Sequence, residues 1–590
     1  IVQMNYDAID AGAKQVVEIA VPESWKDAAD EGLTTPHVGE GGRADVVDFV
    51  KNIQAKVNAQ EGNTLPVSAF NEYVDGSTPS GSSAYEKRGI AVDIPIWQPD
   101  NCIQCNRCAY VCPHAVIRPI ALTEEEAANA PEGMDMIDMM GMPNMKFSIA
   151  VSAYDCTGCG SCANVCPGKK GEKALVMGNM EANAGRQTFF DYGTELPIKP
   201  EVVAKFKETT VKGSQFKQPL LEFSGACAGC GETPYAKLIT QLFGDRMYIA
   251  NATGCSSIWG NSSPSTPYTV NPQGRGPAWS NSLFEDNAEF GYGMLLAQNT
   301  IRERLKASVE KLAENGVNDD VKAAAQEYLD TFSVGATNGT ATDKLVKALE
   351  DCDCGCAERA ELLKNKDFLA KKSQWIFGGD GWAYDIGFGG VDHVLASGQD
   401  INIMVFDTEV YSNTGGQSSK ATKTGATAQF AAGGKETKKK DLAGIAMSYG
   451  YVYVAQIAMG ADFNQTVKAI AEAEAYPGPS LIIAYAPCIN HGIKKGMSKA
   501  QTEEQLAVEC GYWNNFRFNP EAEKKFTLDS KEPKGDYQEF LNGEVRYNAL
   551  MRANPEKAQR LFAQNEAEAM ERYEYLKGLV NLYDGTAKED

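Results

Sequence analysis

The sequence predicts an α/β protein in which a large parallel-sheet domain is fused to a smaller, cysteine-rich α+β domain. From about residue 195 onward, short apolar runs alternate with helical patterns, which favours a mainly parallel sheet covered by helices on both faces. Upstream of that region, two runs of four cysteines have the same internal spacing. A glycine-rich turn between two of the apolar runs indicates a ligand site at one edge of the sheet.

Five apolar runs are predicted to be strands, at residues 247–250, 375–377, 401–406, 451–457 and 481–486. Helical patterns are expected among them at residues 290–312, 321–329, 343–370, 441–449 and 463–475, and a charged docking helix at 556–582. Apolar residues at helical spacing also predict a connecting helix within residues 43–72. Strands separated by helices of this length form βαβ units.

The composition limits the class of protein. A chain of 590 residues is long enough for roughly two to four domains. The formal charge of -22 argues against nucleic acid and anionic membrane as partners. No apolar run is long enough to span a bilayer, and the start at Ile1 shows no leader. We therefore expect a cytoplasmic protein, and the missing initiator Met predicts a piece of a longer chain.

The repeated cysteine runs are the strongest pattern in the sequence. Each has the form C-x₂-C-x₂-C-x₃-C-P, first at Cys102, Cys105, Cys108 and Cys112 and again at Cys156, Cys159, Cys162 and Cys166. This is the bacterial two-cluster ferredoxin pattern, in which the fourth cysteine of each run binds the other cluster. One [4Fe–4S] cluster is thus expected on Cys102, Cys105, Cys108 and Cys166, and another on Cys156, Cys159, Cys162 and Cys112. Zinc is the alternative, although zinc sites usually pair C-x₂-C units across a longer gap.

The long segment between the two cysteine runs is predicted to be an insertion that covers the clusters.

The glycine-rich turn, Gly378-Gly379-Asp380-Gly381, would place Asp380 at the end of one strand, and Thr408 would follow the end of the next. A carboxylate and further oxygens at such a point suit Mg²⁺, and the glycines allow close approach of a diphosphate. The turn resembles the thiamine diphosphate motif, which implies that Asp380, Thr408 and the carbonyl of Val410 hold the metal. That family usually has Asn where Thr408 stands. A glycine-rich turn in a purely structural α/β unit is the alternative.

Four further cysteines are expected near that turn. Cys227 and Cys230 form a C-x₂-C turn, while Cys255 and Cys488 each follow a predicted strand. Because the carboxyl ends of parallel strands converge, these thiols could hold a third cluster, with structural zinc or unrelated buried thiols as alternatives. Cys510 is predicted to be an ordinary buried thiol, and His491, close to Cys488, to be structural. The dense run Cys352, Cys354 and Cys356 could bind metal or act as a redox sensor, with a solvent-side loop without function as the alternative, and no site is predicted there.

The combination resembles the C-terminal half of the pyruvate:ferredoxin oxidoreductase family over nearly the whole chain. Four segments carry the resemblance: Gly225-Ala-Cys-Ala-Gly-Cys-Gly-Glu-Thr-Pro234, Asn281-Ser-Leu-Phe-Glu-Asp-Asn-Ala-Glu-Phe-Gly291, Asp407-Thr-Glu-Val-Tyr-Ser-Asn-Thr-Gly-Gly416 and Ala486-Pro-Cys-Ile-Asn-His-Gly492. It implies a third cluster on Cys227, Cys230, Cys255 and Cys488. It also implies cofactor contacts from Glu232, Cys255, Gly379, Asp380, Gly381, Trp382, Thr408, Glu409, Val410, Tyr411, Ser412 and Asn413. Asn413 would in addition face the 2-oxoacid as a catalytic residue. Residues 1–13 resemble the end of the family's coenzyme A-binding domain, which implies a coenzyme A contact at Asn5.

The resemblance divides the chain into four expected parts. Residues 1–42 would be the end of a coenzyme A-binding-like domain with a linker, and 43–92 a helical connector. Residues 93–194 would be the ferredoxin-like domain with two [4Fe–4S] clusters and an insertion. Residues 195–590 would be the thiamine diphosphate-binding α/β domain, with a proximal cluster and a C-terminal helix.

The implied activity is the reversible oxidative decarboxylation of pyruvate with coenzyme A to acetyl-CoA and CO₂. Electrons would pass from thiamine diphosphate, bound with Mg²⁺, through three [4Fe–4S] clusters to ferredoxin or flavodoxin. A homodimer is expected. The family's groups that activate the cofactor and hold the pyruvate carboxylate have no counterpart here, so we expect catalysis to require a missing N-terminal half. The alternatives are an oxidoreductase for another 2-oxoacid and an electron-transfer subunit whose α/β domain is only a scaffold.

Overall fold

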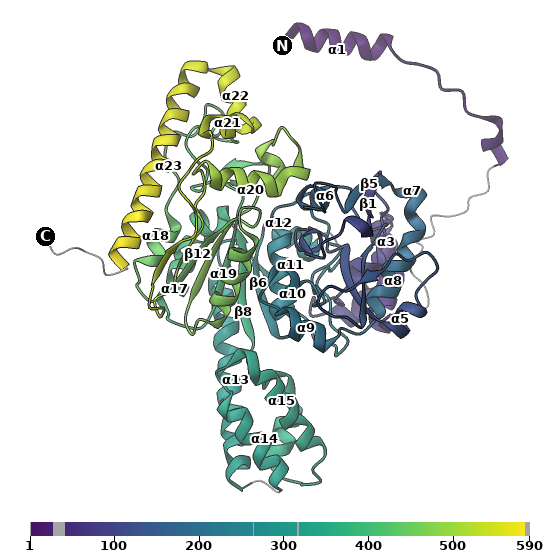
Figure 1. Ribbon diagram of the computed structural model, residues 1–590, viewed down its shortest axis with the longest axis vertical. Helices are drawn as coiled ribbons and strands as arrows, with labels where there is room; N and C mark the ends of the chain where they lie inside the picture. Colours follow the sequence, from purple (N-terminus) through teal and green to yellow (C-terminus); the bar gives the residue numbers. More distant parts are fainter. Residues whose placement is uncertain (1, 28–41, 263–264, 316–317, 584–590) are drawn as a thin grey trace, which may run out of the picture.

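The computed structural model describes residues 2–27, 42–262, 265–315 and 318–583 (Figure 1). Within these ranges no helix combines the length and the apolar character needed to cross a membrane. The described chain forms a sheet domain, a cysteine-rich domain packed beside it and a helical insertion that projects from the sheet.

The sheet domain contains eight strands in the order β15-β14-β12-β13-β9-β8-β6-β7. Their bounds are β6 (Met247–Ala252), β7 (Ala278–Ser282), β8 (Ser373–Gly379), β9 (Asn402–Asp407), β12 (Tyr453–Ile457), β13 (Ser480–Tyr485), β14 (Phe516–Phe518) and β15 (Phe526–Leu528). The strands from β12 to β7 are parallel to their neighbours, whereas β14 and β15 add an antiparallel hairpin at one edge. The predicted mainly parallel α/β sheet is confirmed.

Helices cover both faces of the sheet because alternate side chains of the central strands point in opposite directions. Ile403 and Val405 of β9 lie in the core beneath α17 (Phe388–Ala396) and α18 (Leu442–Met447). Met404 and Phe406 lie in the opposite core, beneath α11 (Thr233–Phe243) and α19 (Phe463–Ala475). Each strand is therefore apolar along its whole length, which is why these strands were visible in the sequence.

The C-terminal segment docks on the same domain. It comprises α20 (Ala500–Glu509), α21 (Tyr537–Asn542), α22 (Val545–Ala553) and α23 (Pro555–Tyr583). Leu561, Phe562 and Leu576 of α23 are buried in the core that lies under α17 and α18. The docking helix predicted over 556–582 is confirmed.

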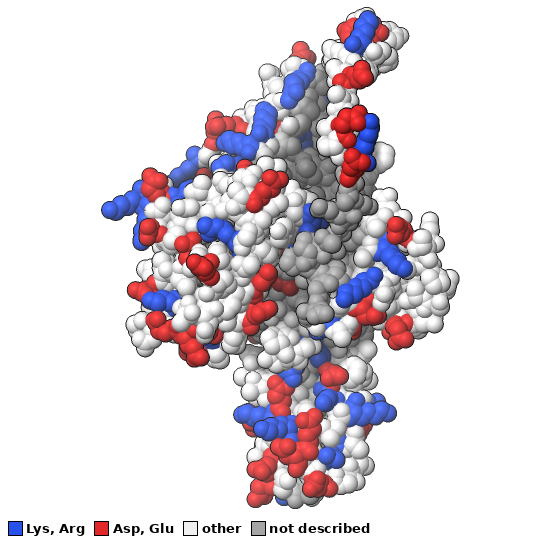
Figure 2. All heavy atoms as spheres, turned by 90° about the vertical axis from the view of Figure 1, so that its right-hand side faces the viewer, with Lys and Arg blue, Asp and Glu red and all other residues white. Residues whose placement is uncertain are grey.

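A helical insertion separates β7 from β8 and extends away from the sheet (Figure 1). It consists of α13 (Asn287–Asn315), α14 (Asp319–Asp330), α15 (Gly335–Glu350) and α16 (Ala357–Lys364). The single helix predicted over 343–370 is wrong, because the chain breaks between α15 and α16 at the cysteine-rich run, which contains Asp353 and Gly355, both poor helix formers. Charges of both signs crowd the outside of this insertion (Figure 2).

The cysteine-rich domain is an α+β unit. Strand β1 (Asp93–Trp97) pairs antiparallel with β5 (Leu175–Asn179), and β2 (Ile117–Thr123) pairs with β4 (Met145–Val151), which also pairs with β3 (Ile137–Asp138). The short helices α4 (Arg107–Tyr110) and α6 (Ser161–Val165) follow the two cysteine loops and contact each other. Val202, Phe216 and Phe223, beyond residue 194, also pack in the core of this domain.

The remaining elements are short or isolated. Residues 44–58 form a continuous helix made of α2 (Ala44–Phe49), a π-turn and α3 (Ala55–Asn58), as predicted for the connector. Short 3₁₀ turns lead from there toward β1. Helix α1 (Val2–Lys14) has no buried side chain and lies apart from both domains (Figure 1).

Candidate functional site

Four neighbouring parallel strands deliver the predicted site residues to one edge of the sheet. The strands β6, β8, β9 and β13 lie side by side in the sheet. Asp380 follows β8 and Thr408 follows β9, while Cys255 and Cys488 come shortly after β6 and β13. Because parallel strands end at the same edge, residues more than 200 positions apart in the sequence meet there.

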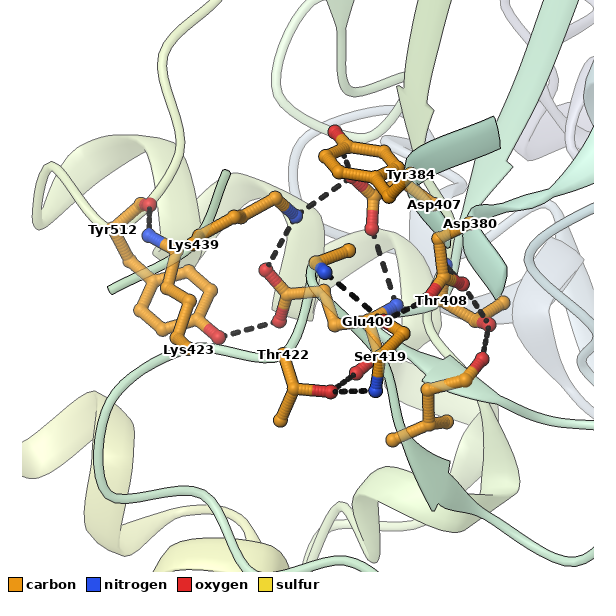
Figure 3. Close-up of polar contacts among 12 residues, drawn as sticks. Asp380, Tyr384, Asp407, Thr408, Glu409, Ser419, Thr422, Lys423, Lys439 and Tyr512 are labelled. Carbon is orange, nitrogen blue, oxygen red and sulfur yellow. Dashed lines mark hydrogen bonds and ion pairs between the residues drawn. The ribbon is translucent and has the colours of Figure 1, made fainter. Parts of the chain in front are cut away.

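Three oxygens at this edge are arranged as neighbouring ligands of one cation (Figure 3). The Thr408 Oγ1 atom lies 3.0 Å from Asp380 Oδ1 and 3.0 Å from the carbonyl oxygen of Val410. Adjacent oxygens around an octahedral Mg²⁺ with metal–oxygen bonds of about 2.0–2.1 Å are themselves about 3 Å apart. The donor set is all oxygen, as Mg²⁺ requires, so the residues present fit this ion.

The Asp380 carboxylate is fully buried, which has an electrostatic consequence. Burial, together with the nearby Asp407 carboxylate, raises the pKa of Asp380 well above its usual range. Hydrogen bonds to Oδ2 from Ser419 Oγ (2.6 Å) and to Oδ1 from the Thr408 backbone N–H (3.2 Å) only partly offset this. A divalent cation beside Asp380 would supply the missing positive charge.

Glu409 is turned away from these oxygens into a buried ion-pair network (Figure 3). Its carboxylate lies 3.0 Å from Lys439 Nζ and 3.0 Å from an Arg546 guanidinium nitrogen. Lys439 also pairs with Asp407, at 2.7 Å. Burial opposes ionisation of Glu409, but the charges of Lys439, Arg546 and Lys423 outweigh it and hold the pKa of Glu409 below its usual range. The Glu409 side chain therefore supports the loop from behind instead of facing the Asp380 side.

The glycines of the turn make room for aromatic rings. A Cβ at Gly381 would lie 2.5 Å from the ring of Tyr411, and one at Gly378 would lie 2.3 Å from the ring of Trp382. At Gly379, by contrast, the nearest atom would be 3.9 Å away. Gly379 therefore leaves open space next to Asp380, whereas the buried Trp382 ring packs within the fold.

The third predicted cysteine set converges at the same edge. The C-x₂-C turn packs on the loop after β13, because the Gly231 N–H donates to the Pro487 carbonyl at 3.1 Å. Burial is the main cause that raises the pKa of the Cys230, Cys255 and Cys488 thiols. The pKa of Cys488 rises to about 11. The cysteines of the set also raise one another's pKa values. Cys227 is exposed, whereas the other three cysteines are partly buried, and partly buried thiolates need a compensating positive charge, which iron would supply. The donor set of Cys227, Cys230, Cys255 and Cys488 fits an iron–sulfur cluster.

Two direct contacts join this cysteine set to the Asp380 site. The Cys255 Sγ lies 3.1 Å from the Ser412 Oγ, on the loop that follows Thr408. The neutral His491 ring bridges the other side: its Nδ1 accepts from the Cys488 N–H at 3.4 Å and its Nε2 donates to the Thr408 carbonyl at 2.7 Å. Burial lowers the pKa of His491 to about 3, which keeps the ring uncharged.

Glu232 lies beside the third cysteine set, at the N-terminus of α11. Its Oε2 accepts a hydrogen bond of 2.8 Å from Trp259 Nε1. Burial raises the pKa of Glu232 to about 7, and its charge raises the pKa of Cys230 and Cys255. Glu232 is thus a buried carboxyl that exchanges a proton near neutral pH, within the electrostatic reach of both cysteines.

The two ferredoxin-type cysteine runs cross over as expected. One cavity is lined by Cys102, Cys105, Cys108 and Cys166, and a second by Cys112, Cys156, Cys159 and Cys162. The two loops have matching backbones, with positive φ at Gln104 and Asn106 in one and at Gly158 and Gly160 in the other. Backbone N–H groups donate to sulfur in both cavities, from Gln104 to Cys102 and from Gly158 to Cys156.

The arrangement of these cysteines suits a cluster better than a single zinc ion. Each cavity is lined by three cysteines of one run and the fourth of the other, as in a two-cluster ferredoxin, whereas zinc sites usually pair C-x₂-C units across a longer gap. The insertion before β4 also covers one loop, since Gln104 hydrogen bonds to the backbone of Asp138 and Met140 at 2.8 Å each.

Side chains also connect the cysteine-rich domain to the sheet domain. The His114 Nε2, two residues after Cys112, lies 2.9 Å from the carbonyl of Ala226, the neighbour of Cys227. Lys237 of α11 is 1% exposed, and its ammonium donates to the carbonyls of Ala109 and Tyr110 on α4. Both ferredoxin-type cysteine runs therefore lie close to the third set: Cys112 through His114, and α4, which contains Cys108, through Lys237.

Two predicted site residues stand apart from this assembly. Asn413 is exposed on the turn after Ser412. Asn5 lies on the isolated helix α1, away from the sheet edge.

Several residues at the site were not predicted. Ser419, Asp407, Lys439 and Tyr384 hold or surround the Asp380 carboxylate. Ser419 and Lys439 lie in polar loops without periodicity, and Lys439 belongs to a run of three lysines that looks like a solvated surface segment. Only their distance from Asp380 in the fold identifies them.

Family models match three stretches of the chain. A C-terminal thiamine pyrophosphate-binding domain of thiamine pyrophosphate enzymes matches residues 360–484, and a 4Fe–4S dicluster domain matches residues 101–170. A domain of unknown function matches residues 41–91, the connector. These matches cover the Asp380 turn and both ferredoxin-type cysteine runs.

Similar proteins match the chain over almost its whole length. A pyruvate-flavodoxin oxidoreductase of Enterobacter agglomerans is 54% identical over 98% of this chain and 49% of its own length. A pyruvate:ferredoxin oxidoreductase of Moorella thermoacetica is likewise 54% identical over 98% of this chain and 49% of its own length. A pyruvate dehydrogenase [NADP(+)] of Cryptosporidium parvum is 44% identical over the whole chain and 34% of its own length. The chain spans about half the length of the first two relatives, and over nearly all of its residues it is similar to them.

Proposed function

We propose that this chain is the thiamine diphosphate-binding and electron-transferring part of an enzyme that oxidises pyruvate. The reaction would convert pyruvate and coenzyme A to acetyl-CoA and CO₂, and pass two electrons to ferredoxin or flavodoxin. The observation that carries the proposal is the 3.1 Å contact between Cys255 and Ser412. It joins a four-cysteine set to the loop of an oxygen-lined metal site, as is needed where an organic cofactor delivers electrons to a cluster.

In this proposal some residues would hold Mg²⁺ and the diphosphate, and others position the loop beside the cysteine set. Asp380, Thr408 and the carbonyl of Val410 would hold Mg²⁺, and Gly379 leaves space beside them for a diphosphate. When bound, thiamine diphosphate supplies a carbanion that adds to a 2-oxoacid carbonyl and accepts the electrons left by decarboxylation. Ser412 positions the loop against Cys255, and the His491 ring fixes Thr408 relative to Cys488.

The closeness of the three cysteine sets supports a route for electrons out of the site. Clusters bound to these sets would accept one electron at a time, leading from the sheet edge into the cysteine-rich domain. We propose three [4Fe–4S] clusters, on the set with Cys488, the set with Cys112 and the set with Cys102. The carrier would dock on the cysteine-rich domain, near the set with Cys102.

The activity would belong to the longer protein. Since the chain covers 49% of its relatives' length, we propose that the remaining half supplies the groups that activate thiamine and bind pyruvate and coenzyme A. We further propose that the enzyme is a cytoplasmic homodimer. Reduction of a viologen dye that depends on pyruvate and coenzyme A tests this: the full-length protein should be active and the present chain alone inactive. Robust turnover by the chain alone would show that the remaining half is not required for catalysis, and would refute this proposal.

The substrate and the role of the α/β domain are tested separately. A panel of 2-oxoacids given to the full-length protein should show a preference for pyruvate. A preference for 2-oxoglutarate or a branched-chain acid would instead place the protein elsewhere among the 2-oxoacid oxidoreductases. If the full-length protein bound no thiamine diphosphate in the presence of Mg²⁺, the α/β domain would be a scaffold and the proposal would be wrong.

A further inference from the structure

The helical insertion contains three cysteines that the proposed function does not use. Cys352, Cys354 and Cys356 lie in the loop that joins α15 to α16. Burial alternates along the loop: the cysteines turn toward the insertion, whereas Asp353 and Gly355 are exposed. The loop therefore presents its sulfurs to one side and remains open to solvent on the other.

The first cysteine is a core residue. Cys352 is 4% exposed and belongs to the apolar core of the insertion, together with Leu345, Leu349 and Leu362. Its sulfur accepts a hydrogen bond of 3.4 Å from the Cys354 N–H. Cys352 thus anchors the loop, and its packing in this core explains its position.

The other two cysteines form a close pair. The Cys354 and Cys356 sulfurs are 2.7 Å apart, well inside the roughly 3.5–4.0 Å at which non-bonded heavy atoms usually lie. Both side chains are half-buried and packed at the margin of the same core. Only a small movement separates this arrangement from a covalent bond.

The flanking helices hold the pair in place. Cys356 is the residue before the first turn of α16, and its carbonyl accepts from the Ala360 N–H at 3.3 Å. Arg359 of that turn donates from Nε to the Leu349 carbonyl of α15 at 2.6 Å. Because both ends of the loop are fixed, the two sulfurs cannot easily move apart.

A metal site explains the loop less well. Cys352 is packed among the leucines of the insertion, and of the three cysteines only Cys354 and Cys356 stand at the margin of that core. The loop thus offers two sulfurs in contact and a third committed to the core, which is the arrangement of a dithiol and not of a three-ligand site.

We propose that Cys354 and Cys356 are a redox-active dithiol that is oxidised by small-molecule disulfides such as glutathione disulfide. The thiolate of one cysteine attacks a sulfur of the disulfide; a mixed disulfide forms and one glutathione thiol leaves. The second cysteine then attacks the protein sulfur of the mixed disulfide, so that the Cys354–Cys356 bond forms and the second glutathione leaves. Two electrons and two protons pass from the cysteine pair to the two glutathione molecules. Cys352 stays reduced.

The pair lies far from the cofactor site along the sheet. The insertion leads into the start of β8 at Ser373, whereas Asp380 follows the other end of that strand. The exposed surface around the loop is charged and solvated, with ion pairs such as Lys311–Glu358 and Lys366–Glu350. Oxidation of the pair should therefore leave the Asp380 site unchanged.

Mass spectrometry of one tryptic peptide tests the proposal. The purified full-length protein is equilibrated anaerobically with glutathione buffers of increasing disulfide content, quenched with acid, denatured and alkylated with N-ethylmaleimide. Residues 348–359 form a single tryptic peptide that contains all three cysteines. In oxidising buffer the peptide should lack two hydrogen atoms and contain one alkyl group, which fragmentation places on Cys352.

Single variants separate the pair from its neighbour. Cys354→Ser and Cys356→Ser should each abolish the internal disulfide, and Cys352→Ser should retain it. Three alkyl groups at every buffer ratio, a stable glutathione adduct, or a bond that includes Cys352 would each overturn the proposal. As Cys352→Ser alters a core position, the site of the alkyl group in the wild-type peptide decides the matter by itself.

Discussion

At the residue scale, three oxygens lie together at one edge of the sheet, and side chains from distant loops surround them. Asp380, Thr408 and Val410 belong to a local pattern in which strand ends and glycines determine where the oxygens lie. Ser419 and Lys439 reach Asp380 and Asp407 from loops, at 2.6 and 2.7 Å, and no local pattern relates them to the turn. Glu409 shows the reverse: it belongs to the predicted loop, yet its carboxylate faces Lys439 and Arg546.

Asp380→Asn should abolish Mg²⁺-dependent binding of thiamine diphosphate by the full-length protein. The amide replaces a buried anionic ligand with a neutral one, while its size leaves the fold intact. Isothermal calorimetry of cofactor binding with Mg²⁺ present measures the effect. Asp392→Asn is the matched control, because Asp392 lies on α17 and hydrogen bonds to Tyr449 instead. Wild-type affinity in Asp380→Asn would contradict the assignment.

The affinity for Mg²⁺ should rise with pH. The raised pKa of Asp380 means that the folded protein favours the protonated carboxyl, so the cation must displace a proton. Affinity is therefore lost as the pH falls through the folded-state pKa of Asp380 and levels off above it. Titrations in buffers of different ionisation enthalpy should reveal proton release on binding. A pH-independent affinity without proton release would show that Asp380 is already ionised.

At the element scale, long apolar strands were predicted and short edge elements were not. Strands β8, β9 and β13 are buried on both faces and therefore visible as apolar runs. The half-exposed β7 and the three-residue strands β14 and β15 lack such runs. The single helix predicted over 343–370 is wrong because the apolar periodicity continues across the loop between α15 and α16. The packing of Cys352 in the core holds that loop in place.

The contact between α11 and α4 depends on one buried lysine. Lys237 donates to two carbonyls of α4, and burial lowers its pKa to about 7. Lys237→Met keeps the length but leaves both carbonyls without this donor, which should cost about 1–3 kcal/mol of unfolding free energy. Urea unfolding measures the loss. Lys205→Met, at an exposed position of α9 (Pro200–Phe206), should change little; equal effects of the two variants would argue against the contact.

At the scale of the whole molecule, the sequence identified the parts but not their arrangement. Repeated cysteine spacing predicted the crossed sets, and a family resemblance predicted the third. That the sets lie close together, joined by contacts of His114, Ala226 and Lys237, follows only from the fold. The reason is physical: contacts between the two domains involve single side chains far apart in the sequence, which produce no periodic pattern.

Iron analysis tests the number of clusters in the anaerobically purified, full-length protein. Three [4Fe–4S] clusters correspond to about twelve iron and twelve sulfide ions per chain. Cys488→Ser should lower both by about a third, because it removes one ligand of the third set. Cys510→Ser, which changes a buried thiol at the end of α20 outside all three sets, should retain the full content. Full iron in Cys488→Ser would remove this residue from the cluster.

The proposed function requires electrons to pass directly from the cofactor at the Asp380 site to the neighbouring cysteine set. Electron paramagnetic resonance of the full-length enzyme, mixed anaerobically with thiamine diphosphate, Mg²⁺ and pyruvate, tests it most directly. The wild type should show reduced-cluster signals after pyruvate is added, and Asp380→Asn should show them only with dithionite. Reduced clusters in Asp380→Asn after pyruvate alone, or none in the wild type, would contradict the account.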